Sequence, residues 1–190
     1  MSDQFNYILA KKEDARYVLN CMKELSVELF GYDNVQREVK YIEYAIEDKD
    51  EIYVICEKDG EFVGFAGGAT YHIEKNGKGA NDNAGLITDI LVKEEYRGSE
   101  VAYKLFMMII NSLIEYGKES ALMVVQDTNP NRYLHYAISD EVISREVYTS
   151  ENGKTYVDEI LLIKDLKKIA KISMFEIGKK AALIKRKSSK

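Results

Sequence analysis

The sequence predicts a mixed α+β fold: a central twisted sheet, mostly antiparallel, with helices on both faces. Two pairs of strand-like segments are each joined by a short polar turn, which is typical of antiparallel hairpins. A third segment reads strand, helix, strand, which is typical of one parallel crossover. With 190 residues, of which 46% are apolar and 31% charged, the chain is long enough for a domain with a sizeable core.

The first part of the chain is predicted to hold one strand and two helices. Residues 5–10 alternate enough to form the strand. Residues 13–30 and 35–47 place apolar side chains three or four positions apart, the pattern of amphipathic helices. These side chains are Val18, Met22, Leu25 and Leu29 in the first helix, and Val39, Ile42 and Ile46 in the second. Gly31 is expected to end the first helix, because glycine readily adopts the left-handed conformation found there.

A glycine-containing hairpin is predicted next. Residues 52–57 and 62–73 read as strands, and residues 58–61 form the turn between them. The second strand contains Gly64, Gly67 and Gly68. Because glycine weakens a strand, three of them predict a bulge or the close approach of another backbone or a ligand. Residues 74–83 are expected to be a polar loop.

The following segment is the most informative part of the sequence. An apolar strand over residues 86–92 runs into a charged turn containing Arg97 and Gly98, and a helix then continues to Gly117. The core stripe of this helix consists of Val101, Leu105, Met108, Ile109 and Leu113. A helix N-terminus presents free backbone N–H groups and a positive dipole end, so this turn is suited to bind a phosphate. Glu100 places a carboxylate where that phosphate would lie.

The remaining chain is predicted to form three strands and a short helix. Residues 121–125 are continuously apolar, which is typical of a strand buried on both faces. Pro130 is well placed to start the short helix, which contains Tyr133, Leu134 and Tyr136. Residues 143–149 and 155–163 are strands, and residues 151–154 form the turn that joins them.

Charge divides the chain unevenly. Residues 167–190 carry a net charge of +8, and the preceding residues carry −13. We therefore expect a domain over residues 1–166 followed by a basic C-terminal helix or tail over residues 167–190. This tail either contacts nucleic acid, an acidic surface or another protein, or is solvated or folded back on its own acidic body.

The cysteines, the histidines and the hydropathy of the chain argue against a disulfide framework, a metal site and a membrane span. Cys21 and Cys56 are too few for a disulfide framework, so we expect both to be reduced and buried in a cytoplasmic protein. Neither lies at ligand spacing from another cysteine or a histidine, so no metal site is predicted. His72 and His135 are expected to be structural or surface residues. No apolar run approaches the ~20 residues of a membrane span and no signal-peptide pattern opens the chain, so no membrane association is expected.

Three motifs occur in order along the chain: Asp89 near the end of its strand, the Arg97-Gly98 turn with Ala102, and Asn129 with Tyr136. With these motifs, residues 5–166 resemble the GNAT N-acetyltransferase family. Arg97, Gly98 and Ala102 match the loop that binds the pyrophosphate of an acyl-CoA in that family. Asp89 lies three residues before the valine that ends its strand, as the carboxylate of many members that acetylate small amines does.

The third motif lies after the fifth predicted strand, residues 121–125. Asn129 is followed seven residues later by Tyr136, the spacing of the family's general-acid tyrosine. The resemblance implies a GNAT-like acyl-CoA N-acyltransferase fold. It also implies acetyl transfer from acetyl-CoA to a small amine, polyamine or protein amine.

The resemblance also implies a role for each matching residue. Asp89 would accept the proton of the attacking amine, and Tyr136 would protonate the departing thiolate. Backbone N–H groups near Ile90, Leu91 and Val92 would polarise the thioester carbonyl. The remaining residues implied to bind the cofactor are Arg97, Gly98, Ser99, Val101, Ala102 and Asn129. The strands that contain Ile90 and Val124 would splay apart to admit the pantetheine arm.

Two departures from the family pattern leave a second function open. Glu100 replaces the middle glycine of the pyrophosphate loop, and residues 139–141 replace the usual Gly-Phe after the tyrosine. The alternative is a catalytically inactive GNAT-like module that acts as a binding or structural subunit.

Each candidate residue also has a structural alternative. Asp89 could form a salt bridge or hydrogen bond, and Tyr136 could be a core tyrosine with a bonded hydroxyl. Arg97 could pair with Glu94 or Glu95 at the surface. The sequence fixes neither the acceptor nor the oligomeric state.

Overall fold

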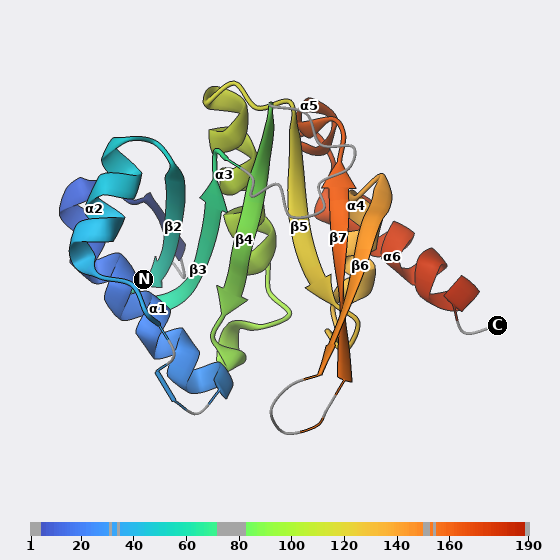
Figure 1. Ribbon diagram of the computed structural model, residues 1–190, viewed down its shortest axis with the longest axis horizontal. Coiled ribbons are helices and arrows are strands. Elements are labelled where there is room, and N and C mark those ends of the chain that lie inside the picture. The colour runs from blue at the N-terminus through green and yellow to red at the C-terminus, as the bar shows by residue number, and fades with distance from the viewer. Residues whose placement is uncertain are drawn as a thin grey trace. The chain divides into compact units, whose positions relative to one another are not determined.

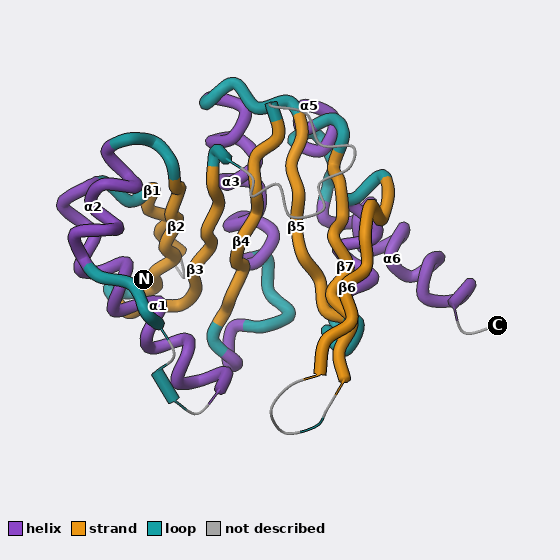
Figure 2. The backbone as a smooth tube through the Cα atoms, viewed as in Figure 1, coloured by secondary structure: helices purple, strands orange, loops and turns teal. Residues whose placement is uncertain are grey.

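The computed structural model describes residues 5–30, 32–33, 35–71, 83–149, 153 and 155–188, and within them it forms seven β-strands and six α-helices (Figures 1 and 2). The strands are β1 (Phe5–Leu9), β2 (Glu51–Lys58), β3 (Glu61–Ala69), β4 (Ala84–Val92), β5 (Ser120–Gln126), β6 (Glu141–Thr149) and β7 (Thr155–Ile163). The helices are α1 (Ala15–Phe30), α2 (Val39–Glu47), α3 (Val101–Glu115), α4 (Arg132–Ile138), α5 (Leu166–Ile169) and α6 (Met174–Ser188).

The chain divides into two compact units, and strand β4 runs through both. The first unit comprises Met1–Thr70 and Thr88–Tyr116, and the second comprises Tyr71–Ile87 and Gly117–Lys190. The strand order is β1-β2-β3-β4 in the first unit and β4-β5-β7-β6 in the second. Of the strand pairs whose register is described, only β4 and β5 are parallel. The predicted mixed, mostly antiparallel sheet is therefore confirmed.

In the first unit, α1 and α2 cover one face of the strands and α3 covers the other (Figure 1). Val18 and Leu25 of α1 and Ile42 of α2 are fully buried, which confirms their predicted core positions. Helix α1 begins at Ala15 because a short 3-10 turn, Lys12–Asp14, precedes it. The predicted stop at Gly31 and the side chain of Leu29 lie outside the described part of the chain.

The predicted hairpin forms between β2 and β3. Asp59 and Gly60 both have positive φ, 54° and 81°, which is what a tight two-residue hairpin turn requires. The prediction that the second strand continues to residue 73 is wrong, because β3 ends at Ala69. Thr70 instead closes the turn after α2: its backbone N–H donates to the Asp50 carbonyl oxygen at 2.8 Å. The predicted loop at residues 74–83 lies outside the described residues except for Asn83.

Two of the three glycines in β3, Gly64 and Gly67, lie where neighbouring elements approach closely, as predicted. A Cβ at Gly64 would lie 3.0 Å from the Leu91 carbonyl oxygen of β4 and 3.2 Å from a methyl carbon of Leu105. A Cβ at Gly67 would lie 2.4 Å from the Thr88 hydroxyl oxygen. These positions therefore have no room for a side chain, and β4 and α3 use the space. A register shift also occurs opposite this part of β3, between Cys56 and Glu57.

Helix α3 packs its predicted stripe into the core. Val101, Leu105, Ile109 and Leu113 are fully buried, while Met108 is only half-buried. The helix ends at Glu115, and Gly117 has a φ of 78°, as its predicted role in stopping the helix requires.

In the second unit, β4 pairs in parallel with β5 from Ala84 opposite Ser120 to Ile87 opposite Met123. Strand β5 then pairs with β7, and β7 pairs with β6. The prediction that residues 121–125 are buried on both faces is wrong for Val124, whose side chain is 53% exposed. Continuous hydrophobicity cannot indicate which face of a strand remains uncovered.

The C-terminal basic segment forms two helices. Ile169 of α5 is buried, as are Ile177 and Ala181 of α6, and α6 packs against α4. Helix α6 continues to Ser188. The proposed division between residues 1–166 and 167–190 stays a prediction, but the segment shares a compact unit with β5, β6 and β7.

The two cysteines agree with the prediction that they are reduced and buried. Cys21 and Cys56 are both free thiols with almost no exposed surface. Burial raises the pKa of the Cys21 thiol to about 12 and that of Cys56 to about 11, so neither is activated as a nucleophile. Among the described helices, none is both long and apolar enough to cross a membrane.

Candidate functional site

Asp89 of β4 lies in the first unit as a half-buried carboxylate. One of its oxygens, Oδ2, lies 3.5 Å from the position that a Cβ at Gly67 would occupy. Burial raises the pKa of Asp89, and the nearby charge of Glu51 raises it further. A hydrogen bond with Thr88 and the charge of Arg37 oppose that rise in pKa. A carboxylate whose pKa is raised is a better proton acceptor than an exposed aspartate.

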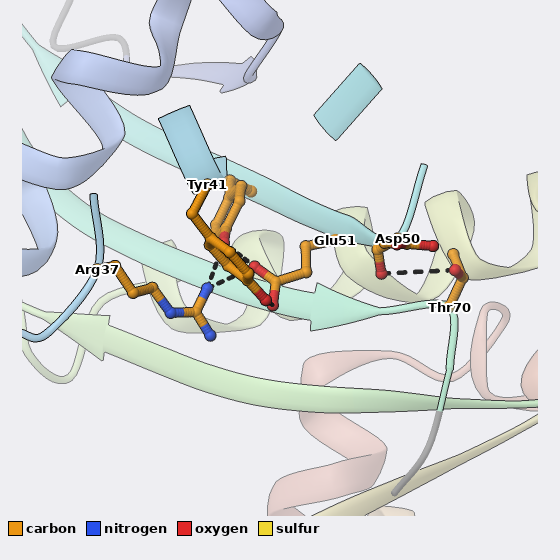
Figure 3. Close-up of polar contacts among 6 residues, drawn as sticks. Arg37, Tyr41, Asp50, Glu51 and Thr70 are labelled. Carbon is orange, nitrogen blue, oxygen red and sulfur yellow. Dashed lines mark hydrogen bonds and ion pairs between the residues drawn. The ribbon is translucent and has the colours of Figure 1, made fainter. Parts of the chain in front are cut away.

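A cluster of ionisable side chains around Glu51 of β2 lies in the same unit (Figure 3). Glu51 is only 6% exposed, and its Oε2 accepts hydrogen bonds from Nη1 of Arg37 and from the hydroxyl of Tyr53. Its Oε1 accepts a hydrogen bond of 3.0 Å from the hydroxyl of Tyr41. The Arg37 guanidinium also lies over the Tyr41 ring, 5.3 Å from the ring centroid. Three donors thus compensate the burial of this carboxylate.

The predicted pyrophosphate turn begins with Arg97, whose side chain is bonded within the protein. Its Nε donates to the Val92 carbonyl oxygen at 3.0 Å, and its Nη2 lies 2.7 Å from an oxygen of Glu28. Arg97 therefore pairs with Glu28 on α1, and not with Glu94 or Glu95 as the structural alternative predicted. The backbone N–H of Glu94 also donates to Glu28, at 3.1 Å, so Glu28 fixes both ends of this turn.

Gly98 and Glu100 determine how the turn enters α3. Gly98 has a φ of 81°, a conformation that a side chain would strain, so glycine is needed here. Glu100 is the N-cap residue, but its carboxylate makes no capping hydrogen bond. It lies 2.5 Å from Nζ of Lys104, one turn along the helix. The carboxylate thus pairs with a lysine and does not bond the first backbone N–H groups of α3.

The other residues predicted in this region have mixed surroundings. Val92 and Val101 are buried, Ile90 and Leu91 are half-buried, and Ser99 and Ala102 are exposed. The hydroxyl of Ser99 donates to the Tyr96 carbonyl oxygen at 2.6 Å. Ser99 therefore helps to close the turn.

Asn129 lies in the second unit and starts the turn before α4. Its Oδ1 accepts a hydrogen bond of 2.8 Å from the backbone N–H of Asn131. Its carbonyl oxygen accepts one of 3.1 Å from the backbone N–H of Arg132. Within the described residues, this side chain therefore shapes the entry to the helix.

Tyr136 lies in the same unit, with its hydroxyl donating a hydrogen bond to Oε2 of Glu159 on β7. Glu159 is 6% exposed, and its other oxygen lies 2.6 Å from Nε of Arg145 on β6. Burial and the bond to Glu159 raise the pKa of Tyr136 to about 12. Tyr136 and Arg145 also line a groove of about 490 Å³, together with Arg132 and Tyr133. The hydrogen bond to Glu159 fits the structural alternative for Tyr136, a core tyrosine with a bonded hydroxyl. The general-acid role of Tyr136 stays a prediction.

His135, expected to be structural or a surface residue, is half-buried on α4. Its Nδ1 lies 3.2 Å from the Asn131 carbonyl oxygen, and burial lowers the pKa of the imidazole. His72 lies outside the described residues.

The predicted site residues thus fall into two groups. Asp89 and the turn that leads into α3 belong to the first unit, and Asn129 and Tyr136 belong to the second. Sequence reasoning missed the two buried glutamates, Glu51 and Glu159. The feature that singled out Asp89, a carboxylate within an apolar strand, could have found Glu159 in the predicted strand over residues 155–163. Glu51 lies just before the predicted strand over residues 52–57, so this feature gave no signal for it.

Comparison with known proteins identifies the family. The model of the Acetyltransferase (GNAT) family matches residues 19–136, more than half of the chain. The sequence matches no curated protein. The turn after β4 and the start of α4 both lie within the matched range, together with Asp89 and Tyr136.

Solved structures show the same fold at low sequence identity. A GNAT-family acetyltransferase from Streptococcus pneumoniae has a TM-score of 0.67 at 13% identity, over 84% of this chain and 98% of that one. An N-acetyltransferase from Staphylococcus aureus Mu50 has 0.64 at 17%, over 86% and 99%. The PaiA N-acetyltransferase from Thermoplasma acidophilum, solved in complex with coenzyme A, has 0.51 at 15%, over 85% and 99%. With the family match over residues 19–136, this fold shows that the chain belongs to the GNAT acetyltransferase family.

Proposed function

We propose that this protein is an N-acetyltransferase that transfers an acetyl group from acetyl-CoA to a primary amine. Membership of the GNAT family supports acetyl transfer in general. The observation that supports the amine acceptor is Asp89, a half-buried strand carboxylate whose pKa is raised by burial. An amine is protonated at neutral pH and must lose a proton to attack, so the reaction needs such a base.

In the proposed reaction, Asp89 accepts a proton from the acceptor, directly or through water. The neutral nitrogen then attacks the thioester carbonyl carbon, while backbone N–H groups of residues 90–92 stabilise the oxygen that becomes negative. As the carbon–sulfur bond breaks, the CoA thiolate leaves and takes a proton from Tyr136. The nitrogen, now part of the amide, loses its second proton to water, and water returns a proton to Tyr136. Because Tyr136 donates to Glu159 and has a pKa raised to about 12, it is a weak acid for this step.

The turn into α3 is proposed to bind the cofactor pyrophosphate. Gly98, Ser99 and Ala102 surround the helix N-terminus, whose dipole favours an anion. An unpaired carboxylate at Glu100 would repel this anion. Its pairing with Lys104 supports binding, because the carboxylate is partly neutralised and makes no capping bond. Arg97 would have to exchange Glu28 for a phosphate oxygen.

One observation favours a second candidate, a catalytically inactive binding module. The hydroxyl of Tyr136, the proposed acid, is bonded to a buried carboxylate. In that case the basic segment at residues 167–190 would carry the function by binding an acidic protein, an acidic surface or nucleic acid. Two buried thiols fit a reducing, cytoplasmic location for either candidate.

Calorimetry with acetyl-CoA and CoA separates these candidates. The enzyme should bind acetyl-CoA with a dissociation constant in the micromolar range, as is usual for enzyme substrates. It should also release free CoA when a primary amine is added. Absence of binding at millimolar acetyl-CoA, measured at two temperatures so that an enthalpy near zero cannot hide it, would exclude the enzyme. Binding without CoA release across a panel of amines would favour the inactive module.

A further inference from the structure

We infer that Arg37 is a specificity-determining residue of the acceptor site, and that it binds a carboxylate on the same acceptor molecule whose amine approaches Asp89. The acceptor class is therefore an amino acid, or a compound with a similarly placed carboxylate. This inference rests on the proposed function, and it names the acceptor that the function leaves open.

The first support is that Arg37 is held in place at one edge. Its Nη1 is bonded to Oε2 of Glu51 and to the hydroxyl of Tyr53, both almost fully buried. The guanidinium plane lies over the ring of Tyr41. A guanidinium fixed in this way has little conformational freedom left to lose when a ligand binds.

The second support is that the other edge of the guanidinium makes no hydrogen bond within the described residues. Among the described residues, the hydrogen bonds of Arg37 involve only Nη1, and its side chain is 33% exposed. Figure 3 shows the second amino nitrogen turned away from Glu51. The edge formed by Nε and this nitrogen matches the two oxygens of a carboxylate.

The third support is the position of Asp89 relative to this group. Tyr53 of β2 is directly opposite Gly67 of β3, and Oδ2 of Asp89 from β4 lies 3.5 Å from the position that a Cβ at Gly67 would occupy. The charges of Arg37 and Glu51 both act on Asp89. A base for the amine and a cation for an anionic group therefore lie near each other in one compact unit.

The balance of charge favours a carboxylate over a phosphate. Among the described residues that act on this site, Glu51 and Asp89 place two negative charges beside the positive charge of Arg37. A doubly charged phosphate would be repelled more strongly than a singly charged carboxylate. The protonated amine of an arriving amino acid offsets the charge of Asp89.

The test compares primary amines that differ only in the carboxylate: an amino acid, its amide, its decarboxylated amine and the matching aminoalkyl phosphonate. For the wild-type protein, kcat/KM should be about 10- to 100-fold higher for the amino acid than for its amide or decarboxylated amine, as charge-assisted hydrogen bonds predict. The difference should lie mostly in KM, because Arg37 contacts no reacting atom. The phosphonate should be poorer than the amino acid, and a better phosphonate would overturn the choice of carboxylate.

An Arg37→Lys variant keeps a cation beside Glu51 but lacks the planar fork. It should reduce the preference for the amino acid to about threefold or less, since a lysine makes only a point contact. Arg145→Lys is the matched control, because Arg145 also pairs with a buried glutamate, and the preference should persist in it. Thermal unfolding of both variants shows whether they fold.

Binding of the amino acid in the presence of CoA, measured by calorimetry, separates this inference from the proposed function. Binding that Arg37→Lys weakens, without turnover of any amine, supports the inference and removes the function. Equal kcat/KM for the amino acid and its decarboxylated amine overturns the inference and keeps the function. If neither binding of the amino acid nor turnover of any amine is observed, both the inference and the proposed function are overturned.

Discussion

The two units contain similar clusters that differ in their surroundings. In the first, Glu51 is buried and bonded by Tyr53 and Arg37; in the second, Glu159 is buried and bonded by Tyr136 and Arg145. Both clusters satisfy a carboxylate that would otherwise be costly to bury.

The difference lies in what is next to each cluster. Arg37 acts on Asp89, a carboxylate whose pKa is raised by burial, and its own side chain is one-third exposed. Arg145 is two-thirds exposed, and the tyrosine of its cluster is the predicted acid itself. We propose that the first cluster orients groups towards an acceptor, whereas the second holds the hydroxyl of Tyr136. The variants below test this distinction.

The largest effect is expected from Asp89→Asn, which removes the proposed base. We expect kcat/KM to fall by about 10²- to 10⁴-fold, the usual contribution of general base catalysis. Affinity for acetyl-CoA should stay within a factor of about two, because a base for the acceptor adds nothing to cofactor binding. Asp158→Asn is the matched control: Asp158 of β7 is also half-buried with a raised pKa, but it lies in the other unit.

Asp89 also sets the expected pH dependence. Because burial raises its pKa above the ordinary 3.8, the loss of kcat/KM on acidification should begin at a higher pH than for an exposed aspartate. Below that pKa the carboxylate is protonated and cannot accept a proton. The raised pKa also means that ionised Asp89 opposes folding at pH 7, so Asp89→Asn should unfold at the same or a higher temperature. A lower unfolding temperature would indicate that Asp89 is mainly a structural partner.

The next effect concerns stability. Glu51→Ala should lower the free energy of unfolding by about 3–5 kcal/mol, because it leaves the guanidinium of Arg37 and two tyrosine hydroxyls without their acceptor. Glu159→Ala is the comparison in the second unit and should lose a similar amount. Chemical denaturation of both variants gives the values. A loss below about 1 kcal/mol for Glu51→Ala, the range of exposed ion pairs, would show that the cluster is not effectively buried.

Tyr136→Phe should have a smaller effect. We expect kcat to fall about tenfold, less than general acids usually contribute, because a tyrosine with a pKa of about 12 donates its proton poorly. Loss of the hydrogen bond to Glu159 should also lower the free energy of unfolding by about 1–2 kcal/mol. If Tyr136→Phe is destabilised but keeps full turnover, Tyr136 is not the general acid and has only a structural role.

The smallest effect is expected from Glu100→Gln. Since Glu100 already pairs with Lys104, removing its charge should tighten acetyl-CoA binding by about threefold or less. Calorimetry on Glu100→Gln and on the control Lys104→Gln measures this. Tightening by more than tenfold would mean that the carboxylate strongly repels the cofactor.

The sequence predicts the elements better than their surroundings. The helical spacing of Val18, Leu25 and Ile42 predicted core positions that the structure confirms, because the period of a helix is a local property. The exposure of Val124 could not be predicted, because it depends on what covers one face of β5. The end of β3 also depended on a partner elsewhere: Thr70 bonds to Asp50.

The candidate site was predicted only in part for the same reason. Asp89 stands out as a charge within an apolar strand. The partners that define its surroundings, Arg37 and Glu51, lie 52 and 38 positions earlier in the chain. The pairing of Arg97 with Glu28, rather than with its neighbours Glu94 and Glu95, also depends on how α1 packs. Such long-range pairs follow from tertiary packing, which local patterns do not encode.

The central claim is tested most directly by measuring free CoA and acetylated amine in the same reaction, with wild-type protein and with Asp89→Asn. The account predicts one CoA for each acetylated amine with the wild-type protein, and a rate at least about 100-fold lower with Asp89→Asn. Equal rates for the two proteins, or no acetylated amine from a wild-type protein that binds acetyl-CoA, would contradict it.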